Sequence, residues 1–186
     1  MELDQIIQEI YPLPAPSKEA LKKIASLVEF KKGHMLFKAG ENNNNVYLVS
    51  KGLSRGYVDL DSTDATFGFF GEGKPLLSIQ NYVQNIAGYE NIELLEDCVL
   101  YKFRKEDLEQ MYMEDIYLSN WGRKLAEKSF VETERLLITR QFKSSLDRYE
   151  EFQRDYPELM NRVKLKYIAS YLGMTQVNLS RIRAHR

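Results

Sequence analysis

YIASYLGMTQVNLSRIRAHR, residues 167–186, is the stretch that most narrows the fold of this chain. It reads as a short apolar helix, a glycine turn and a second helix. Ala169 provides a small residue where two crossing helices touch, and Gly173 follows four residues later in the turn. This spacing is typical of a helix-turn-helix, in which buried aliphatic side chains hold the two helices at a steep angle. Those side chains are Leu165, Ile168, Leu172, Met174, Leu179 and Ile182.

The second helix of the pair exposes cationic and amide side chains but no carboxylate. Its hydroxyl cap is predicted to be Thr175. An arginine can bind guanine O6 and N7, a glutamine can pair with the adenine edge, and asparagine or serine suits phosphate oxygens. We therefore interpret this helix as a DNA-reading element, with a purely structural helical hairpin as the alternative. The candidate DNA-binding residues are Thr175, Gln176, Val177, Asn178, Ser180, Arg181 and Arg183.

Charge is distributed unevenly along the 186 residues, although the net charge is only −1. Residues 1–113 hold 12 basic and 17 acidic side chains, whereas residues 114–186 hold 14 and 10. After Glu158 there are six basic residues and no acidic one. A local excess of this kind is expected of a surface that binds phosphates, although basic tails are often only solvated.

Short apolar runs separated by glycine turns occupy residues 30–103. Strands at such close spacing predict an antiparallel barrel or jelly roll. Within this region, KPLLSIQNYVQNIAGY (residues 74–89) instead has apolar residues at helical spacing, which predicts a short inserted helix. Such a helix serves either as a cap over a ligand or as a plug for the core.

Two further helical patterns flank the strands. Apolar spacing predicts a helix over residues 18–28 with Ser17 as its N-cap. After Phe103, about 40 residues without proline, with Gly122 as the sole glycine, predict a long helix. We expect this helix to pair with a second copy of the chain, and packing along its own barrel is the alternative. The residues expected along one face of this helix are Leu118, Trp121, Leu125, Glu132 and Leu136.

Several classes of protein are disfavoured by composition. No apolar run approaches the roughly 18 residues of a membrane span, and the acidic N-terminus is unlike a signal peptide, so we expect a cytoplasmic protein with no membrane partner. Cys98 is the sole cysteine, and the only histidines, His34 and His185, are far apart. We therefore expect no metal site, no iron-sulfur or haem cofactor and no enzymatic activity.

Four blocks, in this order, give the chain a resemblance to the cyclic-AMP receptor protein and FNR (Crp/Fnr) family of bacterial transcription regulators. The resemblance implies a cyclic-nucleotide-binding jelly roll, a long dimerisation helix and a helix-turn-helix of the winged type. It implies an α+β fold with a β-barrel sensor domain in residues 1–113, the dimerisation helix in 114–143 and the helix-turn-helix DNA-binding domain in 144–186. The blocks are GHMLFKAGE with VYLVSKGLSRGYV, FFGEGKPL, IELLEDCVLYKFRKEDLEQM and YLGMTQVNLSRIR.

The resemblance also assigns base readers to Gln176, Val177 and Arg181, of which Arg181 alone keeps the family's residue type. Where the family commonly has a glutamate that accepts from cytosine N4, Val177 can contact only a thymine methyl group. The operator is thus expected to differ from the best-known family site. The chain ends at Arg186, so no β-wing is expected after the recognition helix.

The effector pocket implied by the resemblance departs further from the family. The glutamate that holds the ribose aligns with Ser78, and the arginine and serine that hold the cyclic phosphate align with Gly88 and Tyr89. Without a cationic partner a buried phosphate loses a charge-assisted hydrogen bond, which typically contributes about 1.5 to 3 kcal/mol of free energy. We therefore expect that cyclic AMP does not bind in the usual way. Arg55, Lys74 and Lys102 are the basic residues of this region that are candidates to replace the missing arginine.

The leading hypothesis is a homodimeric regulator that binds double-stranded DNA at a palindromic operator, responds to an unidentified small molecule and meets RNA polymerase at promoters. One alternative is an orphan regulator with a purely structural barrel. Another is a cupin-like carrier or enzyme, which needs several histidines in the barrel. The sequence specifies neither the effector nor the operator, nor whether the protein activates or represses.

Overall fold

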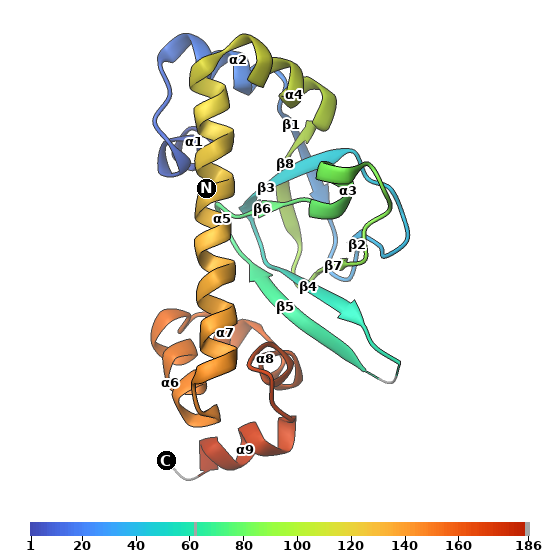
Figure 1. Ribbon diagram of the computed structural model, residues 1–186, viewed down its shortest axis with the longest axis vertical. Coiled ribbons are helices and arrows are strands. Elements are labelled where there is room, and N and C mark those ends of the chain that lie inside the picture. Colours follow the sequence, from blue (N-terminus) through green and yellow to red (C-terminus); the bar gives the residue numbers. More distant parts are fainter. Residues whose placement is uncertain (62, 185–186) are drawn as a thin grey trace.

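The structure is a computed structural model that describes residues 1–61 and 63–184. Two four-stranded antiparallel sheets lie beside one long helix, with smaller helices at its two ends (Figure 1). The α+β architecture with an antiparallel β domain and a long helix is as the sequence predicted. Arg186, one of the basic residues counted above, and His185 lie outside the described residues.

The two sheets enclose one apolar layer. The first has the order β1-β8-β3-β6 and the second the order β2-β7-β4-β5. Aliphatic and aromatic side chains from both sheets, including Leu36, Leu94 and Leu100, are buried between them. The strands are β1 (Ser26–Phe30), β2 (Met35–Phe37), β3 (Asn45–Lys51), β4 (Ser54–Asp59), β5 (Asp64–Phe70), β6 (Pro75–Leu76), β7 (Asn91–Leu94) and β8 (Cys98–Arg104).

Helices precede, interrupt and follow the strands. The predicted inserted helix is present as α3, and the described residues after Arg104 contain helices but no strand. The helices are α1 (Leu3–Ile10), α2 (Ala15–Lys23), α3 (Ile79–Gln84), α4 (Lys105–Glu114), α5 (Ile116–Phe142), α6 (Ser145–Asp155), α7 (Leu159–Arg162), α8 (Leu165–Tyr171) and α9 (Gln176–Ala184).

The helix predicted over residues 18–28 is wrong at both ends. Helix α2 begins at Ala15, so Ser17 is a buried residue within it and not its cap. From Ser26 onward the chain is strand β1, which pairs with β8 from Ser26↔Lys102 to Phe30↔Cys98. Pairing along a whole strand outweighs the helical spacing of a few apolar residues, since β-branched side chains fit a pleated sheet.

The long helical segment after Phe103 is divided at Asp115. This residue caps α5, because its Oδ1 accepts hydrogen bonds from the backbone amides of Tyr117 (2.8 Å) and Leu118 (3.3 Å). Gly122, in contrast, does not interrupt the helix. A Cβ at Gly122 would lie 2.7 Å from the Tyr112 ring, so the glycine permits close contact between α4 and α5.

The apolar face expected to pair with a second copy is largely used within the chain. Leu118 and Trp121 are buried in a cluster formed with α1 and α2, and Leu125 packs against it. The Trp121 indole also donates to the Ile7 carbonyl (3.3 Å). The large apolar side chains that α5 leaves exposed toward its C-terminal end are Phe130, Val131, Leu137, Ile138 and Phe142.

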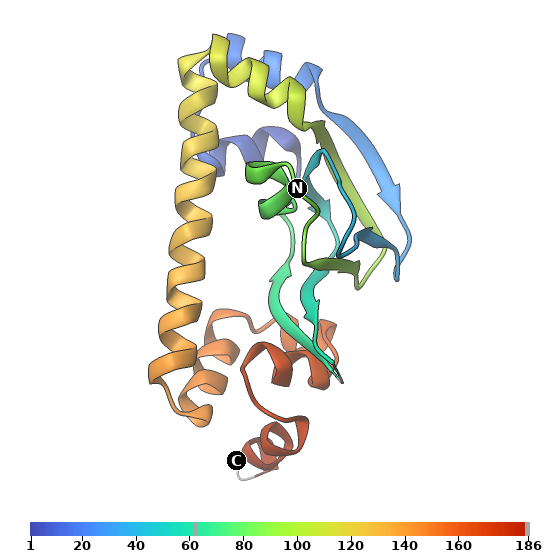
Figure 2. The same ribbon diagram turned by 45° about the vertical axis from the view of Figure 1, so that its right-hand side comes forward.

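Helices α6 to α9 gather at the C-terminal end of α5, at the far end of the molecule from α1, α2 and α4 (Figure 2). Helix α8 lies against the lower part of β5, and α9 projects beyond it (Figure 2). In the described ranges 1–61 and 63–184, no helix combines the length and the apolar character that crossing a membrane requires.

Candidate nucleic-acid interface

Helices α8 and α9 are joined by a turn that Gly173 makes possible. Gly173 has φ +65°, and its amide donates to the Ser170 carbonyl (3.0 Å). The next amide, of Met174, reaches back to the Ala169 carbonyl (3.0 Å). This pair of bonds is the Schellman arrangement that ends a helix on a left-handed residue. The turn thus has the geometry that the sequence predicted.

The start of α9 is capped as expected. The Thr175 hydroxyl accepts a hydrogen bond from the backbone amide of Asn178 at 3.1 Å. Leu179 is fully buried on the inner side of the helix. Val177, in contrast, is 61% exposed. Of the other predicted readers, Asn178 is half-buried, and the exposed ones are Thr175, Gln176, Ser180, Arg181 and Arg183.

One core includes residues from both halves of the molecule. Helices α6 to α9 contribute most of it, for example Phe152, Ile168 and Leu179. Leu53 and Leu95, which belong to the β-sheet region, are buried in the same cluster. The α8–α9 pair is therefore packed against the sheets in this structure. Sequence reasoning did not find this contact, because Leu53 and Leu95 look like ordinary sandwich residues.

Not every basic residue after Glu158 is free to bind phosphate. The Arg162 guanidinium makes two hydrogen bonds with Glu96 (2.9 and 2.8 Å) and lies 3.6 Å from Glu72. The hydrogen bond to Arg162 holds the pKa of Glu96 below its usual value. Lys164 and Lys166 are exposed beside the Tyr167 ring. The basic surface is thus smaller than the sequence count suggests.

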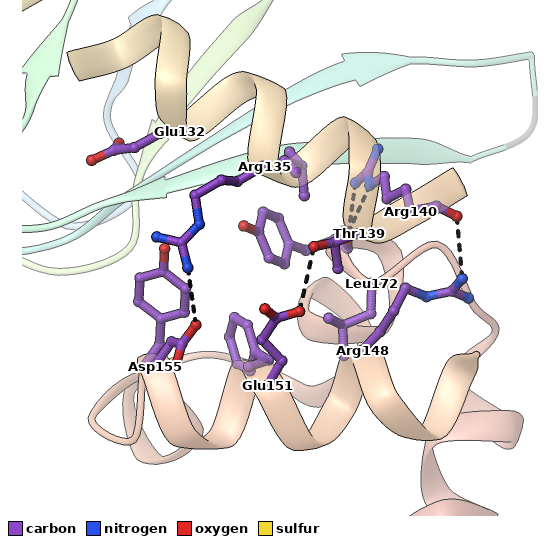
Figure 3. A pocket seen from close by; sticks show the side chains of 12 residues that line it. Glu132, Arg135, Thr139, Arg140, Arg148, Glu151, Asp155 and Leu172 are labelled. Atoms are coloured by element: carbon purple, nitrogen blue, oxygen red, sulfur yellow. Dashed lines mark hydrogen bonds and ion pairs between the residues drawn. The ribbon is translucent and has the colours of Figure 1, made fainter. Parts of the chain in front are cut away.

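A cavity of about 60 Å³ lies where α5, α6 and α8 meet (Figure 3). Its carboxylates are paired: Glu151 accepts from Thr139 (3.3 Å) and Lys143 (2.7 Å), and Asp155 lies 3.7 Å from Arg135. The Arg148 guanidinium donates to the carbonyls of Lys143 (2.9 Å) and Gly173 (3.5 Å). Polar contacts therefore connect the end of the long helix to α6 and to the turn before α9.

The residues predicted for the effector pocket are only partly together. A Cβ at Gly88 would lie 2.2 Å from the Ser78 hydroxyl and 3.1 Å from Glu90 Oε1, so Ser78, Gly88 and Glu90 form one contact group. Tyr89 is 62% exposed. The Ser78 hydroxyl and Glu90 Oε1 are buried and have no hydrogen-bond partner. Sequence reasoning missed Glu90, because a single carboxylate before a strand carries no signal of burial.

The three candidate cations for replacing the missing arginine are paired with other groups or lie outside the Ser78–Gly88–Glu90 group. Arg55 is 2% exposed and pairs with Asp64 (2.9 Å) on the neighbouring strand. Lys74 forms an ion pair with Glu132 of α5. Lys102 lies on β8 and faces Ser26 and Tyr47 in the register of the first sheet. None of the three is part of the Ser78–Gly88–Glu90 group.

The part of the chain that the structure describes contains no group of three or more His, Cys, Asp and Glu side chains able to hold a metal ion. Cys98 is buried, and burial raises the pKa of its thiol. Its sulfur lies within hydrogen-bond reach of the carbonyls of Glu96 and Leu53. The cysteine is thus a core residue of the sandwich.

Comparison with known proteins bears on both halves of the chain. Residues 27–115 match the family of cyclic nucleotide-binding domains. FixK2 from Bradyrhizobium japonicum has a TM-score of 0.76 at 17% identity, covering 87% of this chain and 84% of that chain. The c-di-GMP responsive global regulator CLP from Xanthomonas campestris has a TM-score of 0.74 at 15% identity, covering 92% and 91%. No curated protein matches the sequence.

A protein from Eubacterium rectale assigned to the Crp/Fnr family has a TM-score of 0.75 at 18% identity, covering 95% of this chain and 87% of that chain. The arrangement of sandwich, long helix and terminal helices therefore defines a protein with the Crp/Fnr fold. Within it, the match to the cyclic nucleotide-binding domain family covers residues 27–115. The resemblance seen in the sequence is confirmed.

Proposed function

We propose that this chain is a homodimeric, sequence-specific DNA-binding transcription regulator. The observation that carries the proposal is the position and surface of α9. This helix lies at the end of the molecule, its N-terminus is capped by Thr175, and it exposes Gln176, Arg181 and Arg183. A helix N-terminus and uncompensated arginines favour phosphates and base edges. The likeness of the fold to the Crp/Fnr regulators supports the same function.

Arg181 is the residue we expect to determine sequence preference. Its guanidinium suits a bidentate contact with guanine, whereas Val177 can add only an apolar contact with a thymine methyl group. Gln176 suits adenine, and Asn178 and Ser180 suit the backbone. Each good base contact contributes about 1 to 3 kcal/mol of discrimination.

The test is selection of bound sequences from random or genomic DNA with wild-type protein and with Arg181→Ala. We expect the variant to bind weakly with reduced preference at one position of each half-site. Arg154→Ala is the matched control, because Arg154 lies on α6 and pairs with Asp155 (2.8 Å). Unchanged preference in Arg181→Ala would remove it from base reading, and wild-type protein without salt-sensitive binding to DNA would overturn the proposal.

The exposed stripe of α5 supports a dimer. Phe130 and Leu137 are seven residues apart, as are Val131 and Ile138, which is the repeat of a coiled-coil seam. At about 100° per residue Phe130 and Leu137 lie on the side of α5 opposite to Trp121, and Val131 and Ile138 lie roughly 90° away from it. A dimer of this kind would read half-sites about 34 Å apart on a palindromic operator.

Sedimentation velocity tests the dimer with two equivalent changes. Leu137→Glu places a charge in the stripe and is expected to give a monomer. Leu60→Glu makes the same change at an exposed leucine in the turn after β4, and is expected to leave the dimer intact. A Leu137→Glu protein that remains dimeric would show that α5 does not form the interface.

We further propose that an effector, where one acts, is not held as cyclic AMP is held in the family. The Ser78–Gly88–Glu90 group holds a buried carboxylate and a buried hydroxyl beside Gly88, and a carboxylate repels a cyclic phosphate. We expect cyclic AMP to leave the melting temperature unchanged, since only ligands of the folded state raise it. A panel of nucleotides and metabolites without any stabilising member would favour the orphan regulator.

A further inference from the structure

Strand β5 is an outer strand of the second sheet, yet its backbone groups at Asp64 and Thr66 are bonded to side chains of α8 and α5. The Thr66 amide donates to the Ser170 hydroxyl (2.9 Å), and this hydroxyl donates to the Asp64 carbonyl (3.1 Å). The Thr66 carbonyl accepts from the Arg140 guanidinium (2.7 Å). One side chain from α8 and one from α5 thus occupy positions where a further strand would pair.

Arg140 also connects the two helices to each other. Its Nε and Nη2 donate to the carbonyl of Tyr171 at 3.0 and 2.6 Å, which satisfies a free carbonyl at the end of α8 (Figure 3). Burial lowers the pKa of Arg140. Its hydrogen bonds therefore join α5, α8 and β5 at one point.

Arg55 makes a second connection between the hairpin and α8. Its guanidinium lies 4.0 Å from the centre of the Tyr57 ring and 3.7 Å from the centre of the Tyr167 ring. Two hydrogen bonds to Asp64 (2.9 and 3.1 Å) hold it in the plane between them. Because Tyr57 belongs to β4 and Tyr167 to α8, the cation is stacked between sheet and helix.

From these contacts we propose that the β4–β5 hairpin positions the DNA-reading helix. Arg55, Asp64 and Thr66 of the hairpin, Arg140 of α5, and Tyr167 and Ser170 of α8 form what we call the β5 clamp. The clamp holds α8, and the Gly173 turn transmits this orientation to α9. This inference rests on the proposed function. It adds a direct connection between the β-sandwich and the DNA-reading helix, besides the connection through the long helix α5.

The β5 clamp holds α8 in place and does not cover the exposed side chains of α9. It therefore fixes the orientation of α9 before DNA binds. Val177, Arg181 and Arg183 are exposed while the clamp is closed. A helix already fixed in orientation loses less entropy on binding than one that is free to move. Breaking the clamp is therefore expected to weaken operator binding without altering the number of phosphate contacts.

The test compares Ser170→Ala with Ser170→Thr and with the control Ser129→Ala in the full-length protein. Ser170→Ala removes the hydroxyl that holds β5, and Ser170→Thr keeps it. Ser129→Ala removes a hydroxyl bonded only to the Leu125 carbonyl of its own helix (3.0 Å). The probes are hydrogen exchange at the Thr66 amide and affinity for the selected operator at several salt concentrations.

We expect Ser170→Ala to exchange faster at Thr66 and to bind the operator about three- to tenfold more weakly, with an unchanged salt slope. Ser170→Thr and Ser129→Ala should behave as wild type. Tyr167→Leu, which keeps apolar burial but removes the stacked ring, should weaken binding in the same sense. Thermal melting of each variant checks that it is folded.

Two results would overturn the inference. Equal operator affinity of Ser170→Ala and wild type would show that the clamp does not affect α9, and tighter binding by the variant would show that the clamp restrains it. Wild-type protein that binds no DNA would overturn the proposed function instead. The two failures are thus distinguishable.

Discussion

Two buried charges of opposite sign, Arg55 in the second sheet and Glu90 just before one of its strands, have different surroundings. Arg55, on β4, is 2% exposed, and its guanidinium is within ion-pair distance of Asp64 (2.9 Å) and Glu93 (3.5 Å). Glu90, just before the neighbouring β7, is 6% exposed; one of its oxygens accepts from the Tyr89 amide (3.1 Å) and the other has no partner. Buried charges usually have hydrogen-bond or ion-pair partners. The incompletely paired Glu90 is therefore expected to lower the stability of the fold, in contrast to Arg55.

The largest expected effect is at the paired charge. Arg55→Met should lower the free energy of unfolding by about 3 kcal/mol, because it leaves Asp64 and Glu93 without the cation that they share. Urea unfolding measures the loss. Lys31→Met is the control, since its partner Asp97 is exposed and no change is expected there. A similar loss of unfolding free energy in both variants would mean that the burial of Arg55 does not determine the contribution of its ion pairs.

A smaller loss is expected at Gly88. Gly88→Ala places a Cβ 2.2 Å from the Ser78 hydroxyl, and we expect it to cost about 2 kcal/mol of unfolding free energy. Ser78→Ala combined with Gly88→Ala should recover most of this loss, because the hydroxyl is then absent. A double variant no more stable than Gly88→Ala alone would contradict this contact.

At Glu90 the expected change has the opposite sign. Glu90→Gln replaces an incompletely paired buried carboxylate by a neutral amide and should raise the free energy of unfolding by about 1 kcal/mol. Urea unfolding would again detect it. Destabilisation by Glu90→Gln would show that the free oxygen has a partner in solution, and the contrast with Arg55 would disappear.

The smallest effect concerns the ion pair of Glu96 with Arg162, which is partly exposed. Because Arg162 lowers the pKa of Glu96 from 4.5, the pair stabilises the protein at neutral pH and this contribution fades as the pH falls through the lowered value. Glu96→Gln should thus cost about 1 kcal/mol at pH 7 and progressively less below pH 4.5. Glu106→Gln, which removes an exposed carboxylate, is the control variant.

Local signals were enough to predict α8, its turn and α9, because Ala169, Gly173 and Thr175 act on residues close to them in sequence. They were not enough for β1, since only pairing with distant β8 distinguishes it from the end of a helix. For α5, apolar spacing predicted a buried face, but not that α1 would cover Trp121. The stacking of Arg55 on Tyr167 and the burial of Glu90 depend on tertiary contacts and have no signature in the chain.

The way β5 is covered has a consequence for solubility. An uncovered outer strand offers a template for edge-to-edge association with another chain, and proteins generally block such strands. Here Ser170 of α8 and Arg140 of α5 block it with their side chains. A release of α8 from β5 would therefore expose an unpaired strand edge. A variant in which the contact of Ser170 with β5 is weakened should aggregate sooner on storage than its melting temperature alone predicts.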